Sequence, residues 1–147
     1  MRKLVTKRFA AWSDIISPDA LDHLILESGG DLRLLLRTLL ADTVDAAYYA
    51  LDRLPLKRDD DIIRTVLQRQ RDLTAQIVVR DEYPLLAAIA KENKPTVENR
   101  AQLATLAHLF DVRAILNYRN GADWLDVNPL LWQLIDNLPV LPREAAA

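Results

Sequence analysis

The sequence predicts a mainly α-helical protein, with a helical bundle in its first half and one β-hairpin near its end. Half of its 147 residues are hydrophobic and only 3 are glycine, a composition that favours helices. Apolar residues recur at helical spacing along most of the chain, and Asn120-Gly121 is a strong hairpin signal. We therefore expect two parts, residues 1–80 and residues 81–147.

Composition argues against several classes of protein. The net charge of −2 and the pI of about 5.7 are not typical of a nucleic-acid-binding protein. The absence of cysteine removes disulfide and thiolate chemistry. No apolar run approaches the roughly 20 residues that span a bilayer, and the N-terminus does not resemble a signal peptide. We expect a cytoplasmic protein without a membrane partner.

Two helices are expected before the first glycines. Residues 1–12 place four apolar side chains on one helical face, namely Leu4, Val5, Phe9 and Trp12. Ser17 is a suitable N-cap and Pro18 suits a first helical position, which predicts a second helix to about Glu27. The inward residues of this second helix are expected to be Leu21, Leu24 and Ile25.

A glycine corner, which we define as Gly29, Gly30 and Asp31, separates this helix from the next. Glycine accepts a positive φ without a Cβ clash, so either glycine can end a helix in the left-handed conformation. Asp31 can accept hydrogen bonds from the first N–H groups of the following helix. Leucine periodicity predicts that this helix is long, running from Leu32 to about Leu54.

The last helix of the first half follows Asp59, Asp60 and Asp61. Carboxylates at a helix start cap it and interact favourably with its dipole. Three consecutive carboxylates point in different directions, so capping is favoured over a divalent-metal site. The helix is expected to run to about Val78, with an apolar face and an exposed basic face. The apolar face is expected to contain Ile62, Ile63, Val66, Leu67 and Leu73. The basic face is expected to contain Arg64, Arg69 and Arg71.

Residues 81–147 predict two helices, a hairpin and a closing helix, an order typical of a small winged-helix-like unit. The first helix begins near Tyr83, and Thr96 is expected to cap the second. The inward residues of the second helix are expected to be Val97, Leu103, Leu106, Leu109 and Phe110. The hairpin is expected over residues 112–127 and the closing helix from Pro129, with Pro139 and Pro142 near the end of the chain.

Two segments resemble the C-terminal part of bacterial AAA+/STAND-type ATPases. Gly30-Asp31-Leu32-Arg33 is similar to the sensor-2 Gly-Asp-x-Arg element in the helical lid of that family. The segment 116–130 is similar to the end of the same proteins, with a Tyr-Arg-Asn-Gly turn, a tryptophan and an Asp-Val-His-Pro-like step. Asn128 stands where that step has histidine, so no chemistry is assigned to it. The resemblance implies a lid-like bundle over residues 1–80 and a winged-helix-like unit over residues 81–147.

The resemblance also implies a role for Arg33. In that family the sensor-2 arginine reaches the phosphates of ATP bound by the preceding P-loop domain. This chain contains no P-loop, so ATP and Mg²⁺ are expected only with a P-loop domain in the same or another chain. Arg37, one turn further, is the backup candidate. The alternatives are surface ion pairs, with Asp31 or Glu27 for Arg33 and with Asp42 or Asp45 for Arg37.

No catalytic or metal-binding constellation is evident, because His23 and His108 have no nucleophile or ligand set near them in sequence. We expect a non-enzymatic regulatory and interaction module that couples nucleotide state to partner contacts. The main alternative is a stand-alone winged-helix protein that binds DNA or acts as an adaptor, and a weaker one is a helical dimerisation domain. Candidate nucleic-acid or partner contacts are Arg100, Gln102, Arg113 and Arg119.

Overall fold

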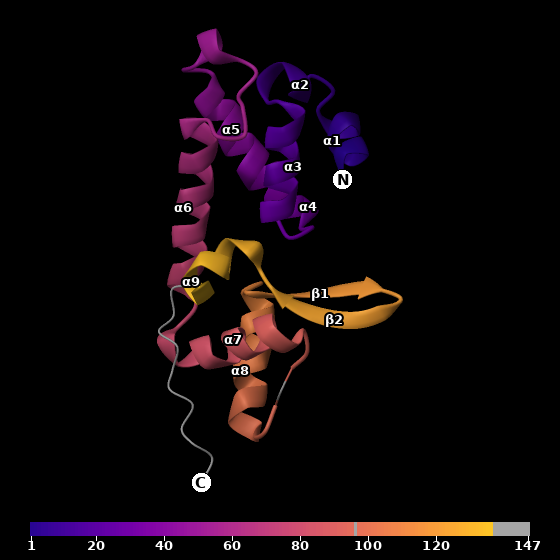
Figure 1. Cartoon of the computed structure of the whole chain (residues 1–147), viewed down its shortest axis with the longest axis vertical. Helices are drawn as coiled ribbons and strands as arrows, with labels where there is room; N and C mark the ends of the chain where they lie inside the picture. The colour runs from indigo at the N-terminus through magenta and orange to yellow at the C-terminus, as the bar shows by residue number, and fades with distance from the viewer. Residues whose placement is uncertain (96, 137–147) are drawn as a thin grey trace. The chain divides into compact units, whose positions relative to one another are not determined.

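A computed structural model of the chain describes residues 1–95 and 97–136, which divide into two compact units (Figure 1). The first unit comprises residues 1–76 and 128–130, and the second comprises residues 77–127 with the described residues after 130. Both units are mainly helical, and among the described residues the only sheet is a two-stranded antiparallel hairpin. This architecture confirms the predicted fold class of a helical bundle and a small unit with one β-hairpin. None of the described helices combines the length and apolar character of a membrane-spanning segment.

The first unit packs several short helices against one long helix, α6 (Figure 1). Its elements are α1 (Arg2–Arg8), α2 (Trp12–Ile15), α3 (Pro18–Glu27), α4 (Leu32–Leu34), the π-helix η1 (Leu35–Leu39), α5 (Leu40–Ala47), the 3-10 turn η2 (Leu51–Arg53) and α6 (Asp61–Ile77). The largest fully buried side chains come from α3, η1, α6 and the loops before α3 and α6. They are Ile16, Leu21, Leu24, Leu35, Leu39, Leu56, Ile63 and Leu67, and Leu130 joins the same core.

Local capping sets two helix starts in this unit. The Oγ of Ser17 accepts a hydrogen bond from the Ala20 N–H at 3.4 Å, and Pro18 occupies the first helical position of α3. The Oδ1 of Asp60 accepts a hydrogen bond from the Ile62 N–H at 2.9 Å at the start of α6. These contacts confirm the predicted caps, because each side-chain oxygen satisfies an N–H group that has no partner within its helix.

The helix after the glycine corner is shorter than predicted. It ends at Ala47 and not near Leu54, and its middle residues form a π-helix. The Tyr49 and Ala50 N–H groups bond three residues back, to the carbonyls of Ala46 and Ala47, which tightens the last turn. Ala50 is buried, so packing ends this helix at a point where the sequence contains no glycine or proline.

Two predicted apolar faces in the first unit are partly wrong. The N-terminal helix breaks after Arg8, which leaves Leu4 exposed while Val5 and Trp12 are buried. On α6, Leu73 is exposed although it lies two turns after the buried Val66 on the same face, because the buried stretch of this helix ends at Leu67.

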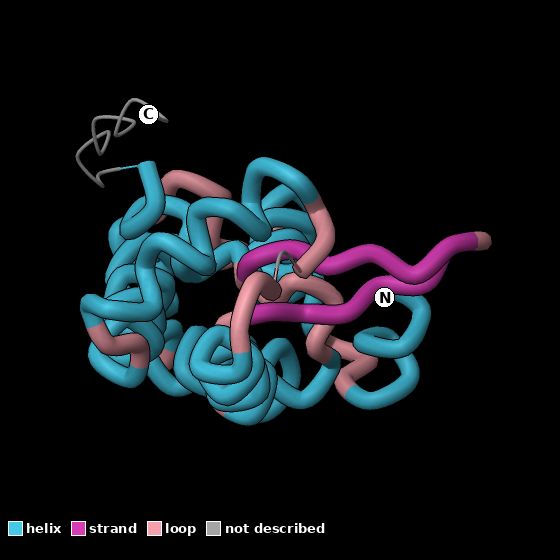
Figure 2. Tube along the Cα trace, turned by 90° about the horizontal axis from the view of Figure 1, so that it is seen from below, coloured by secondary structure: helices cyan, strands magenta, loops and turns pink. Residues whose placement is uncertain are grey.

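The second unit has helices α7 and α8 followed by the hairpin β1–β2, whose strands run side by side (Figure 2). Its elements are the 3-10 turn η3 (Arg80–Glu82), α7 (Tyr83–Glu92), α8 (Arg100–Asp111), β1 (Ile115–Asn120), β2 (Ala122–Val127), the 3-10 turn η4 (Pro129–Leu131) and α9 (Trp132–Asp136). Gly121 makes the tight turn with a φ of 86°. The core of this unit contains Val78, Leu85, Leu86, Ile89, Leu106, Leu109, Ile115, Leu125, Val127 and Leu131.

Asn93 joins α7 to the hairpin. It ends α7 in the left-handed conformation, with a φ of 57°. Its carbonyl accepts a hydrogen bond from the Leu125 N–H at 2.9 Å, and its Nδ2 donates to the Leu125 carbonyl at 3.2 Å. These two bonds fix the position of β2 on α7.

The start of α8 and its inward face differ from the prediction. Asn99, and not Thr96, caps α8, because the Oδ1 of Asn99 accepts a hydrogen bond from the Gln102 N–H at 3.0 Å. Thr96 itself, like Pro139 and Pro142, lies outside the described residues. The later start places only two of the predicted apolar residues, Leu106 and Leu109, in the core. Val97, Leu103 and Phe110 are exposed.

Candidate functional site

The glycine corner has the geometry that its sequence predicts. Gly29 and Gly30 have φ values of 60° and 83°, a region that residues with a Cβ rarely adopt. The Ser28 side chain is fully buried, and its Oγ donates to the Ile25 carbonyl at 2.7 Å. The Asp31 N–H bonds to the Ser28 carbonyl at 3.0 Å. The corner is therefore held by its own backbone and by a buried serine.

Asp31 anchors the next helix. Its Oδ1 accepts hydrogen bonds from the N–H groups of Arg33 at 2.9 Å and Leu34 at 3.1 Å, which confirms the predicted cap. Its carbonyl accepts from the Leu35 N–H at 2.9 Å. Arg33 thus lies in the first turn of a capped helix, directly after a rigid corner.

The π-helix η1 sets which side chains face outward after the cap. Leu35 and Leu39 are fully buried in the core, while Arg33 and Arg37 are exposed. The two arginines are four residues apart and lie on the same outer face, which we call the arginine face. Thr43 is fully buried and its Oγ1 donates to the Leu39 carbonyl at 2.6 Å, where the π-helix passes into α5. Short π-helical segments are frequent at functional sites.

Two of the acidic residues considered as partners for the arginine face, Glu27 and Asp42, are engaged elsewhere. Glu27 lies 2.9 Å from the Nη2 of Arg71 on α6, so Arg71 belongs to the interior and not to the predicted exposed basic face. Asp42 accepts a hydrogen bond from the Nε2 of Gln70 at 3.3 Å. Within residues 1–95 and 97–136, neither Arg33 nor Arg37 forms an ion pair. Both guanidinium groups are available to an anion from solution or from a partner.

A polar cluster with buried atoms, which we define as His23, Glu27 and Arg71, joins α3 to α6. Glu27 Oε2, Arg71 Nε and His23 Nδ1 are buried atoms that form no hydrogen bond in the described part of the chain. Glu27 Oε2 is therefore close enough to Arg71 Nη2 for an ion pair, but the angle between the two groups does not meet the geometry of a hydrogen bond.

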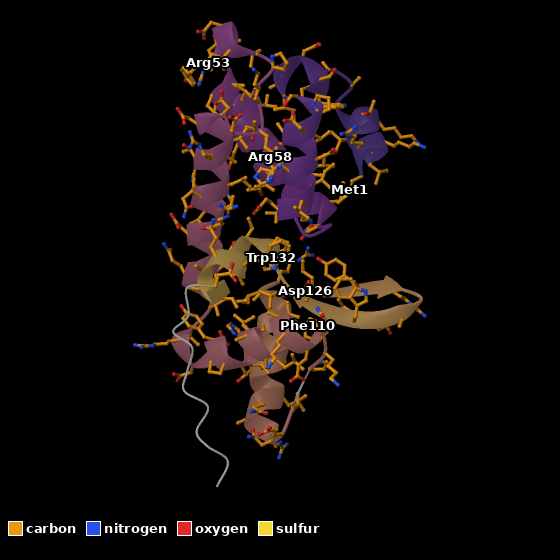
Figure 3. All side chains as sticks on the ribbon, viewed as in Figure 1. Met1, Arg53, Arg58, Phe110, Asp126 and Trp132 are labelled. Carbon is orange, nitrogen blue, oxygen red and sulfur yellow. The ribbon has the colours of Figure 1, made fainter. Side chains whose placement is uncertain are left out.

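The pKa of His23 is lowered from its ordinary value, chiefly by burial. The charge of Glu27 raises this pKa, while the charges of Arg58 and Arg71 lower it. Arg58 lies beside α3 in the first unit (Figure 3). No local sequence pattern connected His23 and Glu27 on α3 with Arg58 and Arg71, because the two pairs are far apart along the chain.

The three consecutive aspartates act as a helix start. Asp60 caps α6 and lies 3.1 Å from Nη1 of Arg53, and Asp61 pairs with Arg64. An open cavity of about 420 Å³ beside them is lined by both signs of charge: Arg53, Lys57, Asp59, Asp60, Asp61 and Arg64. Within the described residues no group of three or more side chains is arranged to hold a metal ion.

The candidate contacts of the second unit come from three places in the chain: α8, the turn before β1, and β1. Arg100 is exposed at the start of α8, but Gln102 is occupied because its Oε1 accepts a hydrogen bond from the Glu98 N–H at 2.7 Å. Arg113 was expected on the hairpin and instead lies in the turn before β1, with a left-handed φ of 58°. Arg119 lies on β1, 3.6 Å from Asp123. Acidic residues outnumber basic ones over residues 77–127 and 131–136, which does not favour a phosphate-binding surface.

No family model, curated protein or solved structure matches this chain.

A second buried carboxylate, that of Glu82, forms a contact with a histidine that the sequence did not predict. The carboxylate of Glu82 is buried, and its Oε1 lies 2.5 Å from Nδ1 of His108 on α8. Its Oε2 accepts a hydrogen bond from the Val79 N–H at 3.0 Å. Glu82 therefore ties η3 to α8, which assigns both residues a structural role. The sequence separation of 26 explains why no local pattern indicated the contact.

Proposed function

We propose that the chain is a non-catalytic regulatory and interaction module of an AAA+/STAND-type ATPase. In this proposal Arg33 contacts the phosphates of a nucleotide held by a P-loop domain, supplied by the same or another chain. ATP and Mg²⁺ are bound by that domain and not by this chain. The observation that carries the proposal is the exposed guanidinium of Arg33 on a capped helix, with Glu27 engaged by Arg71.

The chemistry of the arginine face suits this role. A guanidinium donates several hydrogen bonds in a planar fork that matches phosphate oxygens, and it stays charged at any physiological pH. Since Arg33 and Arg37 form no ion pair in the described part of the chain, binding an anion requires no existing pair to break. Arg37, one turn further on the same face, is a second contact for the same anion.

The helix that carries Arg33 also reaches the core of the first unit. Leu35 and Leu39 lie two and six residues after Arg33 and are fully buried, so the helix backbone at Arg33 cannot shift without moving core side chains. A change in nucleotide state would then move the bundle as a body, as in domain closure around a ligand.

The proposal is tested with the chain in complex with its P-loop ATPase, by comparing Arg33→Ala with the control Arg64→Ala. Arg64 is also an exposed arginine, on α6 and outside the glycine corner. We expect Arg33→Ala to lower ATP turnover by about tenfold or more, because arginines at phosphates stabilise developing charge, and to leave the circular dichroism of the chain unchanged. The isolated chain should bind no ATP. Equal turnover in the two variants would overturn the proposal.

The alternative of a stand-alone winged-helix adaptor is supported by the order of α7, α8 and the hairpin in the second unit. A DNA partner is the less favoured form of this alternative, since Gln102 is occupied in the cap and acidic residues predominate in this unit. Duplex binding by the full chain that weakens steeply with salt would support DNA binding and contradict the ATPase proposal.

A further inference from the structure

The second unit contains a cavity of about 360 Å³ that the arginine face does not involve. Three elements contribute to it: α7, β2 and α9. Its lining residues are Ala90, Asp126, Trp132, Ile135 and Asp136. Figure 3 labels two of them, Asp126 and Trp132. The volume is at the small end of the range for ligand pockets, which suits one side chain or a small molecule.

The charge in this cavity is negative. Two of the five lining residues are carboxylates, and none of the five is basic. Within the described residues neither Asp126 nor Asp136 forms a salt bridge, whereas Asp123 on the same strand lies 3.6 Å from Arg119. The Oδ1 of Asp126 accepts a hydrogen bond from the Val127 N–H at 2.7 Å, which holds the carboxylate without neutralising it.

Trp132 adds an aromatic surface to the two carboxylates. Its Nε1 donates a hydrogen bond to the Val127 carbonyl at 3.2 Å, which fixes the indole beside β2. The residue is 38% exposed, so part of the ring remains accessible to a ligand. The face of an indole attracts a cation through its quadrupole, and tryptophan is the strongest of the aromatic side chains in this respect.

We propose that this cavity binds the cationic side chain of a basic peptide, with Trp132 against the cation and Asp126 and Asp136 as counter-charges. An arginine guanidinium or a lysine ammonium supplies the required charge, and the apolar stem of either side chain can contact Ala90 and Ile135. This site is independent of the nucleotide-sensing role of Arg33, so each proposal can fail without the other.

The test uses the full chain and two model ligands, N-acetyl-arginine amide and N-acetyl-citrulline amide. Citrulline has nearly the same shape as arginine but carries no charge. The readout is the indole N–H resonance of Trp132 in NMR spectra, assigned by its loss in Trp132→Phe. We expect a saturable shift with the arginine ligand and none with the citrulline ligand. Equal shifts with both ligands, or no saturation with either, would overturn the proposal.

Matched variants then test which carboxylates contribute to binding of the cation. Asp126→Asn and Asp136→Asn remove one charge each, and an asparagine at position 126 keeps the oxygen that accepts from Val127. Asp123→Asn removes the same charge from the hairpin outside the cavity. We expect each cavity variant to weaken binding by about fivefold, the upper range for a partly exposed ion pair, and Asp123→Asn to leave binding nearly unchanged. Equal losses in all three variants would show a general charge effect and contradict the site.

A third ligand distinguishes a peptide from a small cation. Triarginine amide offers the same guanidinium with neighbouring residues that can contact the rim of the cavity. Binding that is tighter than the threefold statistical gain from three equal groups supports a peptide ligand. A gain of threefold or less contradicts the peptide assignment, since the cavity then recognises the isolated cation alone.

Discussion

Arg71 of α6 brings its Nη2 to 2.9 Å from the Glu27 carboxylate at the end of α3. The two side chains are only 18% and 10% exposed, so this ion pair joins two helices inside the first unit. It also removes Glu27 as a partner for Arg33. One interior contact thus both holds the bundle together and leaves the arginine face open.

Breaking this pair should destabilise the first unit strongly. Glu27→Gln leaves the charge of Arg71 buried without a counter-charge, which typically costs about 3 kcal/mol. Urea unfolding followed by circular dichroism measures the change in free energy of unfolding. The control is Arg64→Gln, which breaks the exposed pair with Asp61 and should change stability little. If the two variants lose equal stability, the Glu27–Arg71 contact does not hold the helices together.

Stability should depend on pH through His23. Its pKa is lowered in the folded state, first by burial and then by Arg58 and Arg71, so the folded protein binds fewer protons than the unfolded chain. The contribution of His23 is therefore fully present above its unfolded pKa of about 6.5 and is lost as pH falls below that value. We expect the free energy of unfolding to decline more between pH 7.5 and 5.5 in the native chain than in His23→Gln. Parallel curves for the two proteins would contradict this assignment.

Removing the cap of the arginine-bearing helix should have a moderate effect. Asp31→Ala leaves the N–H groups of Arg33 and Leu34 without their side-chain acceptor and should cost about 1 kcal/mol. Asp31→Asn retains an oxygen in the same place and should recover most of this loss. Thermal unfolding of the two variants provides the comparison. Equal losses in the two variants would contradict this, because both remove the charge and only asparagine keeps the oxygen that accepts the two hydrogen bonds.

The hairpin contains an aromatic pair that should stabilise it measurably. Tyr118 and Trp124 are directly opposite in the register, with ring centroids 4.5 Å apart and nearly parallel planes. A double-mutant cycle with Tyr118→Ala and Trp124→Ala should give a coupling of about 1 kcal/mol. The neighbouring pair of Arg119 and Asp123 is highly exposed and 3.6 Å apart, so the same cycle there should give a coupling near zero. Equal couplings would contradict a specific role for the stacked rings.

Local sequence signals account for much of the fold. Ser17 with Pro18, Asp31 after two glycines, and the Asn120-Gly121 turn each act within a few residues, and the structure confirms each of them. The cap of α8 was predicted at the wrong residue, Thr96, because two nearby residues give similar local signals. Asn99 and Gln102 have the spacing of a cap and its third helical residue, whereas Thr96 directly after Pro95 gave an earlier signal of the same kind.

Contacts between distant residues could not be predicted in this way. Glu27 and Arg71 meet across two helices, and Glu82 and His108 are separated by α7 and a loop. The end of α5 depends on the burial of Ala50, which no breaker residue marks. Arg33 was singled out because of its neighbours in sequence, whereas the engagement of Glu27 by another arginine depends on Arg71 of α6.

Residues 128–130 belong to the first unit although the chain on either side of them belongs to the second. The polypeptide therefore crosses between the units three times and not once. A single proteolytic nick after Gln76 would leave the core of the N-terminal piece without Leu130, and the released piece would carry that leucine uncovered. Truncation at the apparent boundary after Gln76 therefore removes a core residue from the first unit.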